Sequence, residues 1–179
     1  MNLQQFCSRD EARPQLMKPW SIGEHTIATN GHIMIRVPRV DDVPENADAP
    51  PTHKVWARCD MQGEPLEVMQ CAIPTPVMET CMDCAGSKKK HVCPSCNCPC
   101  PDCDGTGEVE INQDTSVGFF GVPIDLRYAR MILALPKVRF FKPTGRENPL
   151  PFKFEGGDGC VMPLRREKTN HITAKLADS

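Results

Sequence analysis

Seven of the chain's 11 cysteines lie between Cys81 and Cys103, and this cluster constrains the fold more than any other feature. Residues 79–110 around it carry almost no large apolar side chains, so they cannot build a core by themselves. A secreted disulfide scaffold would spread its cysteines to join distant loops. Close Cys-x-x-Cys pairs in a reducing compartment are instead typical of metal binding. The sequence therefore predicts a segment folded around zinc.

Two Cys-x-x-Cys pairs in the cluster have matching flanks. Cys81 and Cys84 stand in a CxxCxG context, and Cys100 and Cys103 stand in a CxxCxGxG context. The two-residue spacing lets both thiolates of a pair reach one ion, and two pairs complete a tetrahedral site. Glycines just after each pair allow positive φ and a close chain reversal. Four protein ligands leave no open coordination position, which predicts a structural rather than a catalytic zinc.

Four further donors lie between the two pairs: His91, Cys93, Cys96 and Cys98. They have the number and chemistry of a second, nested Cys3His zinc site. The alternative is one zinc ion with spare thiols. The Cys96-x-Cys98-x-Cys100 spacing also leaves open an exchange of Cys98 with a neighbouring ligand.

Residues 81–107 resemble the cysteine-rich zinc module of DnaJ-type chaperones, in which repeated CxxCxGxG units pair first with last. The resemblance implies that Cys81 and Cys84 share a zinc ion with Cys100 and Cys103. The first unit departs from the pattern at Ser87-Lys88, where its second glycine is missing. No His-Pro-Asp tripeptide of a J-domain occurs elsewhere, so a cochaperone role does not follow.

Catalytic motifs are missing from the sequence. Pro99-Cys100-Pro101-Asp102-Cys103 matches half of a zinc deaminase signature, but that chemistry also needs a His-x-Glu, and no histidine here is followed by one. A thioredoxin-like pair would open a helix, whereas glycines follow Cys103. GxSxG, P-loop, HExxH and Rossmann fingerprints do not occur. We therefore expect a protein that is not an enzyme.

Composition further limits the class of protein that this chain can be. The chain has 40% hydrophobic and 25% charged residues, which is enough apolar material for a globular core. A formal net charge of -2 argues against a protein that coats nucleic acid, although the 11 bases and seven acids of residues 111–179 make that part the more basic one. No apolar run reaches the length of a membrane span, and the N-terminal residues lack the order of a signal peptide. These features predict a cytoplasmic protein that does not bind membranes.

Hydrophobic patterns predict an α+β fold with an antiparallel sheet packed on one main helix. Asn30-Gly31 between two β-rich runs predicts a hairpin, and Asp125 is the expected N-cap of the main helix. We expect residues 1–78 and 111–167 to form the body, 79–110 a zinc-binding insertion and 168–179 a flexible tail. The expected elements are a short helix over 2–8, strands at 21–28, 32–37, 55–57, 66–69, 117–122, 138–141, 152–154 and 160–164, a loop at 38–52, and a helix over 126–135.

Three segments resemble bacterial DNA polymerase sliding clamps. Ala28-Thr29-Asn30-Gly31-His32 is similar to the ATDGH segment, with Asn in place of the usual Asp. Residues 122–136 resemble the strand-to-helix passage of the last clamp domain, and residues 156–165 resemble its terminal VMPMR strand. In clamps the ATDGH motif and the motifs of the last domain belong to different domains of a ring, whereas this chain has material for one domain. The resemblance implies a single clamp-like domain carrying a zinc insertion, a combination that also looks like small bacteriophage proteins.

Two function classes follow from these observations. The first is a non-enzymatic, clamp-like, zinc-containing binding module that acts through contacts with a protein partner in phage or bacterial DNA replication or host takeover. The alternative is a nucleic-acid-binding zinc protein that uses Lys88-Lys89-Lys90 and the basic C-terminal part. Three adjacent lysines alone are few cations for phosphate binding at physiological salt.

Overall fold

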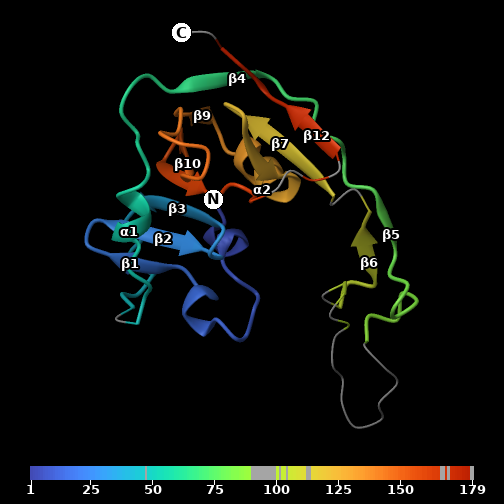
Figure 1. The fold of residues 1–179 in the computed structure, drawn as a ribbon. Helices are drawn as coiled ribbons and strands as arrows, with labels where there is room; N and C mark the ends of the chain where they lie inside the picture. The colour runs from blue at the N-terminus through green and yellow to red at the C-terminus, as the bar shows by residue number, and fades with distance from the viewer. Residues whose placement is uncertain are drawn as a thin grey trace.

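The computed structural model describes residues 1–46, 48–89, 100, 102–103, 105–111, 114–165, 168 and 170–177. β-Structure dominates these residues, and the fold is α+β with two α-helices (Figure 1). The helical elements are η1 (Leu3–Phe6), η2 (Pro14–Leu16), α1 (His53–Trp56) and α2 (Leu126–Leu133). The strands are β1 (Trp20–Ile22), β2 (His25–Thr29), β3 (Ile33–Pro38), β4 (Leu66–Gln70), β5 (Met78–Thr80), β6 (Glu108–Glu110), β7 (Thr115–Phe119), β8 (Val122–Asp125), β9 (Arg139–Phe140), β10 (Leu150–Phe154), β11 (Gly157–Val161), β12 (Asn170–Thr173) and β13 (Lys175–Leu176).

An eight-stranded antiparallel sheet forms the centre of the molecule, in the order β1-β2-β3-β11-β10-β9-β4-β13. The predicted Asn30-Gly31 hairpin is confirmed, because β2 and β3 pair on either side of it. In the middle of the sheet β3 pairs with β11, which sets Ile33 opposite Val161. The segments before and after the cysteine cluster therefore belong to one sheet.

A smaller sheet of β12, β7 and β8 packs with α2 against the large sheet (Figure 1). The N-cap predicted for α2 is confirmed, since the Asp125 side chain accepts a hydrogen bond from the Arg127 N–H. The main core lies between these layers and includes a stack of Phe119 on Phe140, with ring centroids 4.5 Å apart. A second, smaller core around Trp20 and Met34 packs beneath α1 and η2.

The cysteine segment leaves the body through a two-stranded ribbon. β5 pairs with β6 in antiparallel register from Met78 opposite Glu110 to Thr80 opposite Glu108. Residues 78–110 are here called the cysteine module. The ribbon and the described residues beyond it stand to one side of the two larger sheets (Figure 1). Its buried cysteines form a cluster separate from both cores of the body.

Several expected strands are divided by turns. The run 117–122 is two strands, β7 and β8, because Phe120 and Gly121 take φ of 54° and 73°, as a tight hairpin requires. The run 21–28 is divided at Gly23, whose φ is 54°. The strand expected over 160–164 begins and ends earlier, as β11 (Gly157–Val161).

Two other predictions assign the wrong type of structure to a segment. Residues 55–57 were expected as a strand but belong to α1 and its C-cap, where Val55 and Trp56 pack onto the small core. A short apolar run does not distinguish a strand from one helical turn. Residues 170–176 form β12 and β13, whereas the sequence predicted a flexible tail there. β12 runs parallel to β7 and β13 pairs with β4, so both depend on partners distant in the chain.

Candidate metal centre and apolar pocket

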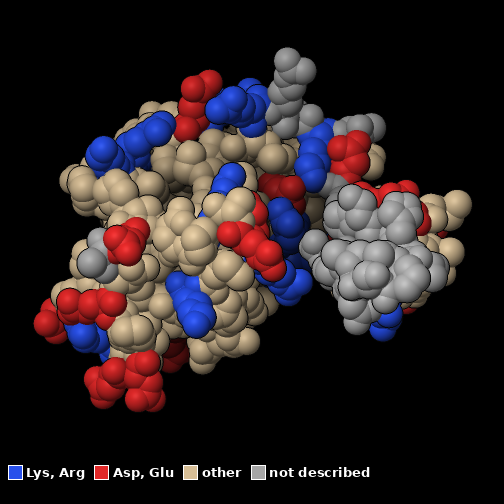
Figure 2. Space-filling view, turned by 90° about the horizontal axis from the view of Figure 1, so that it is seen from below, with Lys and Arg blue, Asp and Glu red and all other residues tan. Residues whose placement is uncertain are grey.

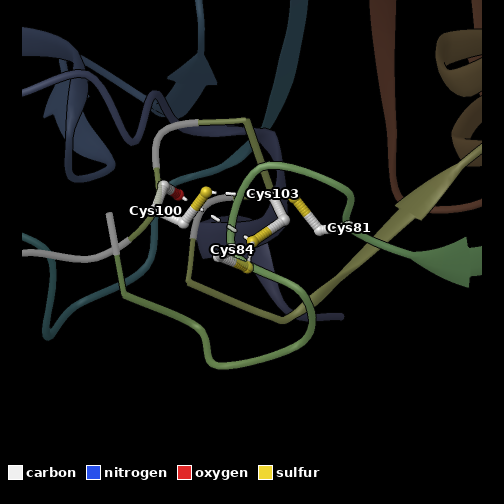
Figure 3. A group of neighbouring side chains, drawn as sticks. All are labelled: Cys81, Cys84, Cys100 and Cys103. Carbon is white, nitrogen blue, oxygen red and sulfur yellow. Dashed lines mark hydrogen bonds between the residues drawn. The ribbon is translucent and has the colours of Figure 1, made fainter. Parts of the chain in front are cut away.

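Four cysteine side chains converge inside the cysteine module (Figure 3). The sulfurs of Cys81, Cys84, Cys100 and Cys103 all lie within 4.8 Å of one another, and each residue is less than one-tenth exposed. The Sγ–Sγ distance is 3.9 Å from Cys81 to Cys100 and 3.7 Å from Cys84 to Cys103. A metal–sulfur bond of about 2.3 Å places sulfurs about 3.8 Å apart at the corners of a tetrahedron. The group therefore has the geometry to hold one tetrahedrally coordinated metal ion.

Backbone hydrogen bonds bring the two Cys-x-x-Cys pairs together. The Cys81 N–H donates to the Gly107 carbonyl oxygen and the Cys100 N–H donates to that of Lys88, both at 2.9 Å. Each pair thus holds the loop that follows the other. Gly86, Gly105 and Gly107 have φ between 73° and 85°, which confirms the conformational freedom expected of glycines after the pairs.

The Gly107 N–H donates to the Cys103 sulfur at 3.2 Å. Burial acts to raise the pKa of Cys103, but this hydrogen bond and those of the neighbouring thiols outweigh it and lower the pKa to about 7. Burial raises the pKa of Cys100 to about 11. Metal ligation needs thiolates, so binding an ion here releases protons.

The other predicted ligands, His91, Cys93, Cys96 and Cys98, lie outside the described residues. The second zinc site therefore stays a prediction. Cys7, Cys59, Cys71 and Cys160 belong to the body rather than to this group.

Sequence reasoning missed the residue that ties the cysteine module to the body. Arg130 of α2 forms an ion pair with Glu110 of β6, and its guanidinium also donates to the Pro74 carbonyl oxygen at 2.6 Å. Both side chains of the ion pair are 19% exposed. These partners are 20 and 56 positions from Arg130, so no local pattern signals the contact.

A second feature of the body is an apolar pocket of about 180 Å³. The turn at 29–32 forms one wall, and α1 with the prolines before it forms another. Apolar cavities of about 150 Å³ in proteins hold molecules the size of benzene, so this pocket has room for one large apolar side chain. Its apolar lining includes Leu16, Ile33, Met34, Val55 and Met162.

Comparisons with protein-family models, curated proteins and solved structures give no match to this chain. Among the residues that the structure describes, no helix has the length and apolar character needed to cross a bilayer.

Proposed function

We propose that this chain is a non-enzymatic binding module that holds structural zinc and acts through protein contacts at the apolar pocket. One observation supports the proposal more than any other. The three segments that resemble sliding clamps are far apart in the sequence, yet they meet around the turn at residues 29–32, beside the pocket.

Specific contacts join these segments. The Met162 N–H donates to the His32 carbonyl oxygen at 2.7 Å, which links the third segment to the first. The Asn30 side-chain amide donates to the Tyr128 hydroxyl at 3.2 Å, and the His32 ring stacks on the Tyr128 ring. These contacts hold the turn in a fixed position, so the pocket wall needs little ordering when a partner binds.

The occupant that fits is an apolar side chain of a partner's peptide segment. Burying a leucine or phenylalanine side chain contributes about 1.5–3 kcal/mol. That contribution alone gives weak affinity, so the partner must add contacts around the rim. The clamp resemblance places such a contact in phage or bacterial DNA replication, or in host takeover, as part of this proposal.

Zinc is the metal proposed for the four-cysteine group. Four thiolates are soft ligands, and tetrahedral S4 coordination is typical of zinc and of iron–sulfur sites rather than of calcium or magnesium. Native mass spectrometry of reduced protein should find one zinc ion per chain, and a second only if the inner His91 group also binds. Reduced protein that binds no zinc would contradict the assignment.

A photo-crosslinking residue tests the docking proposal. Gln15 lies at the pocket and is exposed, whereas Ile22 is 56% exposed and serves as a matched position away from the pocket. We expect a crosslinker at position 15 to capture a bacterial protein, and a crosslinker at position 22 not to capture it. Mass spectrometry of the product should place the crosslink in an apolar segment of that protein.

A synthetic peptide of the captured segment should then bind directly, and Met162→Lys should abolish both capture and binding. Capture that is equal at position 22, or unchanged by Met162→Lys, would contradict docking at this pocket.

Nucleic-acid binding through the cysteine module is the alternative. Lys88 and Lys89 are exposed there, but the described part of the module also carries five carboxylates: Glu79, Asp83, Asp102, Glu108 and Glu110. On the face of the molecule in Figure 2, cations and carboxylates alternate. DNA affinity across a salt series separates the two functions, since tight binding with a steep salt dependence would favour the alternative.

A further inference from the structure

A second, polar pocket of about 730 Å³ lies on the other side of the turn at 29–32. The segment that follows η1 forms one wall, and the first turn of α2 forms the opposite wall. His32 lines both this pocket and the apolar one, so the turn separates them. The groups that give the polar pocket its chemistry are Arg9, Asp10, Arg13, His32, Arg127 and Tyr128.

The pocket carries an excess of positive charge. Three guanidinium groups line it against the single carboxylate of Asp10, whose oxygen lies 3.5 Å from Arg13 Nε. Within the described part of the chain, Arg9 and Arg127 form no ion pair. Two guanidinium groups thus remain for an anion from outside.

The Tyr128 hydroxyl supplies a neutral donor at the same place. Its oxygen accepts hydrogen bonds from the Asn30 amide at 3.2 Å and from an Arg127 guanidinium nitrogen at 2.9 Å. Both lone pairs of the oxygen are then used, and no described residue accepts the hydroxyl proton. Burial raises the pKa of Tyr128, so the proton stays in place at physiological pH.

These donors are held in position before any ligand arrives. The Asn30 side-chain oxygen accepts the N–H groups of His32 and Ile33 at 3.0 and 3.1 Å, which fixes the amide that contacts Tyr128. The Arg127 guanidinium lies over the Tyr128 ring, 4.7 Å from its centroid. A guanidinium restrained in this way loses less side-chain freedom on binding than a free one.

We propose that this polar pocket binds the phosphate group of a nucleotide. Guanidinium forks and a hydroxyl donor match the several oxygens of a phosphate, and its double negative charge complements the excess charge of the pocket. The volume exceeds that of a lone phosphate. The His32 ring stacks on Tyr128 by one face, and because the residue is exposed, its other face offers a surface on which a base can stack. The same group occurs on a free nucleotide and at the phosphorylated end of a strand.

NMR titration of the ¹⁵N-labelled full-length chain at low salt tests this site. We expect AMP to shift the amide signals of Arg9, His32 and Arg127 saturably, with a dissociation constant below about 1 mM. Adenosine, which lacks the phosphate, should not bind. A 5′-phosphorylated dinucleotide that binds more tightly than AMP identifies a strand end as the ligand, and equal affinity identifies a free nucleotide.

Three variants sharpen the test. Arg127→Gln should weaken AMP binding at least about tenfold, and Tyr128→Phe, which removes only the hydroxyl, should weaken it several-fold. Arg39→Gln removes an arginine paired with Glu45 away from the pocket and should change nothing. No saturable shift up to about 10 mM AMP, binding unchanged by Arg127→Gln, or equal binding of N-acetylaspartate would each overturn the proposal. Arg127 is exposed, so we expect the thermal unfolding of Arg127→Gln to match that of the parent chain. A match shows that weaker AMP binding in this variant does not come from misfolding.

Discussion

At the residue scale, the metal centre depends on a glycine at a position where any side chain would be strained and crowded. Gly107 has a φ of 85°, and a Cβ built on it would lie 2.9 Å from the Gly86 carbonyl oxygen and 3.1 Å from the Lys88 side chain. Its N–H also donates to the Cys103 sulfur. Position 107 therefore sets both the approach of the two loops and the environment of one ligand.

Gly107→Ala should weaken zinc binding at least about tenfold, because the added methyl group forces the loops apart. Competition with a chromophoric chelator measures the affinity. Gly63→Ala is the matched control, since Gly63 has a φ of 89° with no atom within 4 Å of the added Cβ. The control carries the backbone strain alone and should bind zinc normally. Equal affinities in both variants would contradict the role given to Gly107.

Cys7 makes the free energy of unfolding of the body depend on pH. Burial raises its pKa from 9.0 to about 11, although a backbone hydrogen bond at Thr29 acts in the opposite direction. Between those values the thiol ionises in the unfolded chain but not in the folded one. This thiol therefore leaves the free energy of unfolding unchanged below pH 9. As the pH rises towards 11 it lowers that free energy, by about 1 kcal/mol at pH 10. Urea unfolding at pH 8 and pH 10 should show a smaller loss of stability in Cys7→Ala than in the parent chain.

At the element scale, α2 and β6 are joined by the partly buried ion pair of Arg130 with Glu110. Arg130→Gln should loosen the β5–β6 ribbon and speed hydrogen exchange of its amides about tenfold, while zinc stays bound. The matched control is Arg139→Gln, because Arg139 pairs with Glu67 at the surface, where ion pairs contribute little. Loss of zinc from Arg130→Gln would show that the pair supports the metal centre rather than the ribbon.

Elements with local signals were predictable from the sequence. Asn30-Gly31 determines its hairpin and Asp125 its helix start, because each acts through backbone groups a few residues away. Each Cys-x-x-Cys pair was predictable because its two thiols are three positions apart, and the matching flanks indicated that the two pairs belong together. The turn at Phe120 was not, because a non-glycine residue with positive φ carries no clear sequence signal.

Glycines 157 and 159 show how packing overrides a local pattern. They precede the strand expected at 160–164, but they lie in β11, where a Cβ on Gly159 would be 2.4 Å from the Phe152 ring. The glycine leaves space for the aromatic ring of the neighbouring strand. The pairing of β12 with β7 and the contacts of Arg130 likewise depend on distant residues, and the sequence alone did not reveal them.

At the scale of the whole molecule, the cysteine module and the body have separate apolar cores. Cys100→Ser should release the zinc held by the four-cysteine group and disorder the module, because too few apolar side chains remain to hold it. The body should keep its NMR spectrum and its cooperative unfolding. Cys71→Ser, a body cysteine outside the group, should retain the metal. Unfolding of the body in Cys100→Ser would contradict the separation.

The place where the cysteine module interrupts the chain also bears on how fast the protein folds. Pairing Ile33 with Val161 closes a loop of 128 positions, and the β5–β6 ribbon joins Thr80 to Glu108 across 28 of them. A module folded beforehand shortens the loop to about 100 positions, which lowers the entropic free-energy cost of closing it by only about 0.2 kcal/mol. Refolding with zinc and with a chelator should therefore proceed at rates within about 1.5-fold of each other. Since ordering the module scarcely speeds closure of the central sheet, a newly made chain can complete its body first and acquire the metal afterwards.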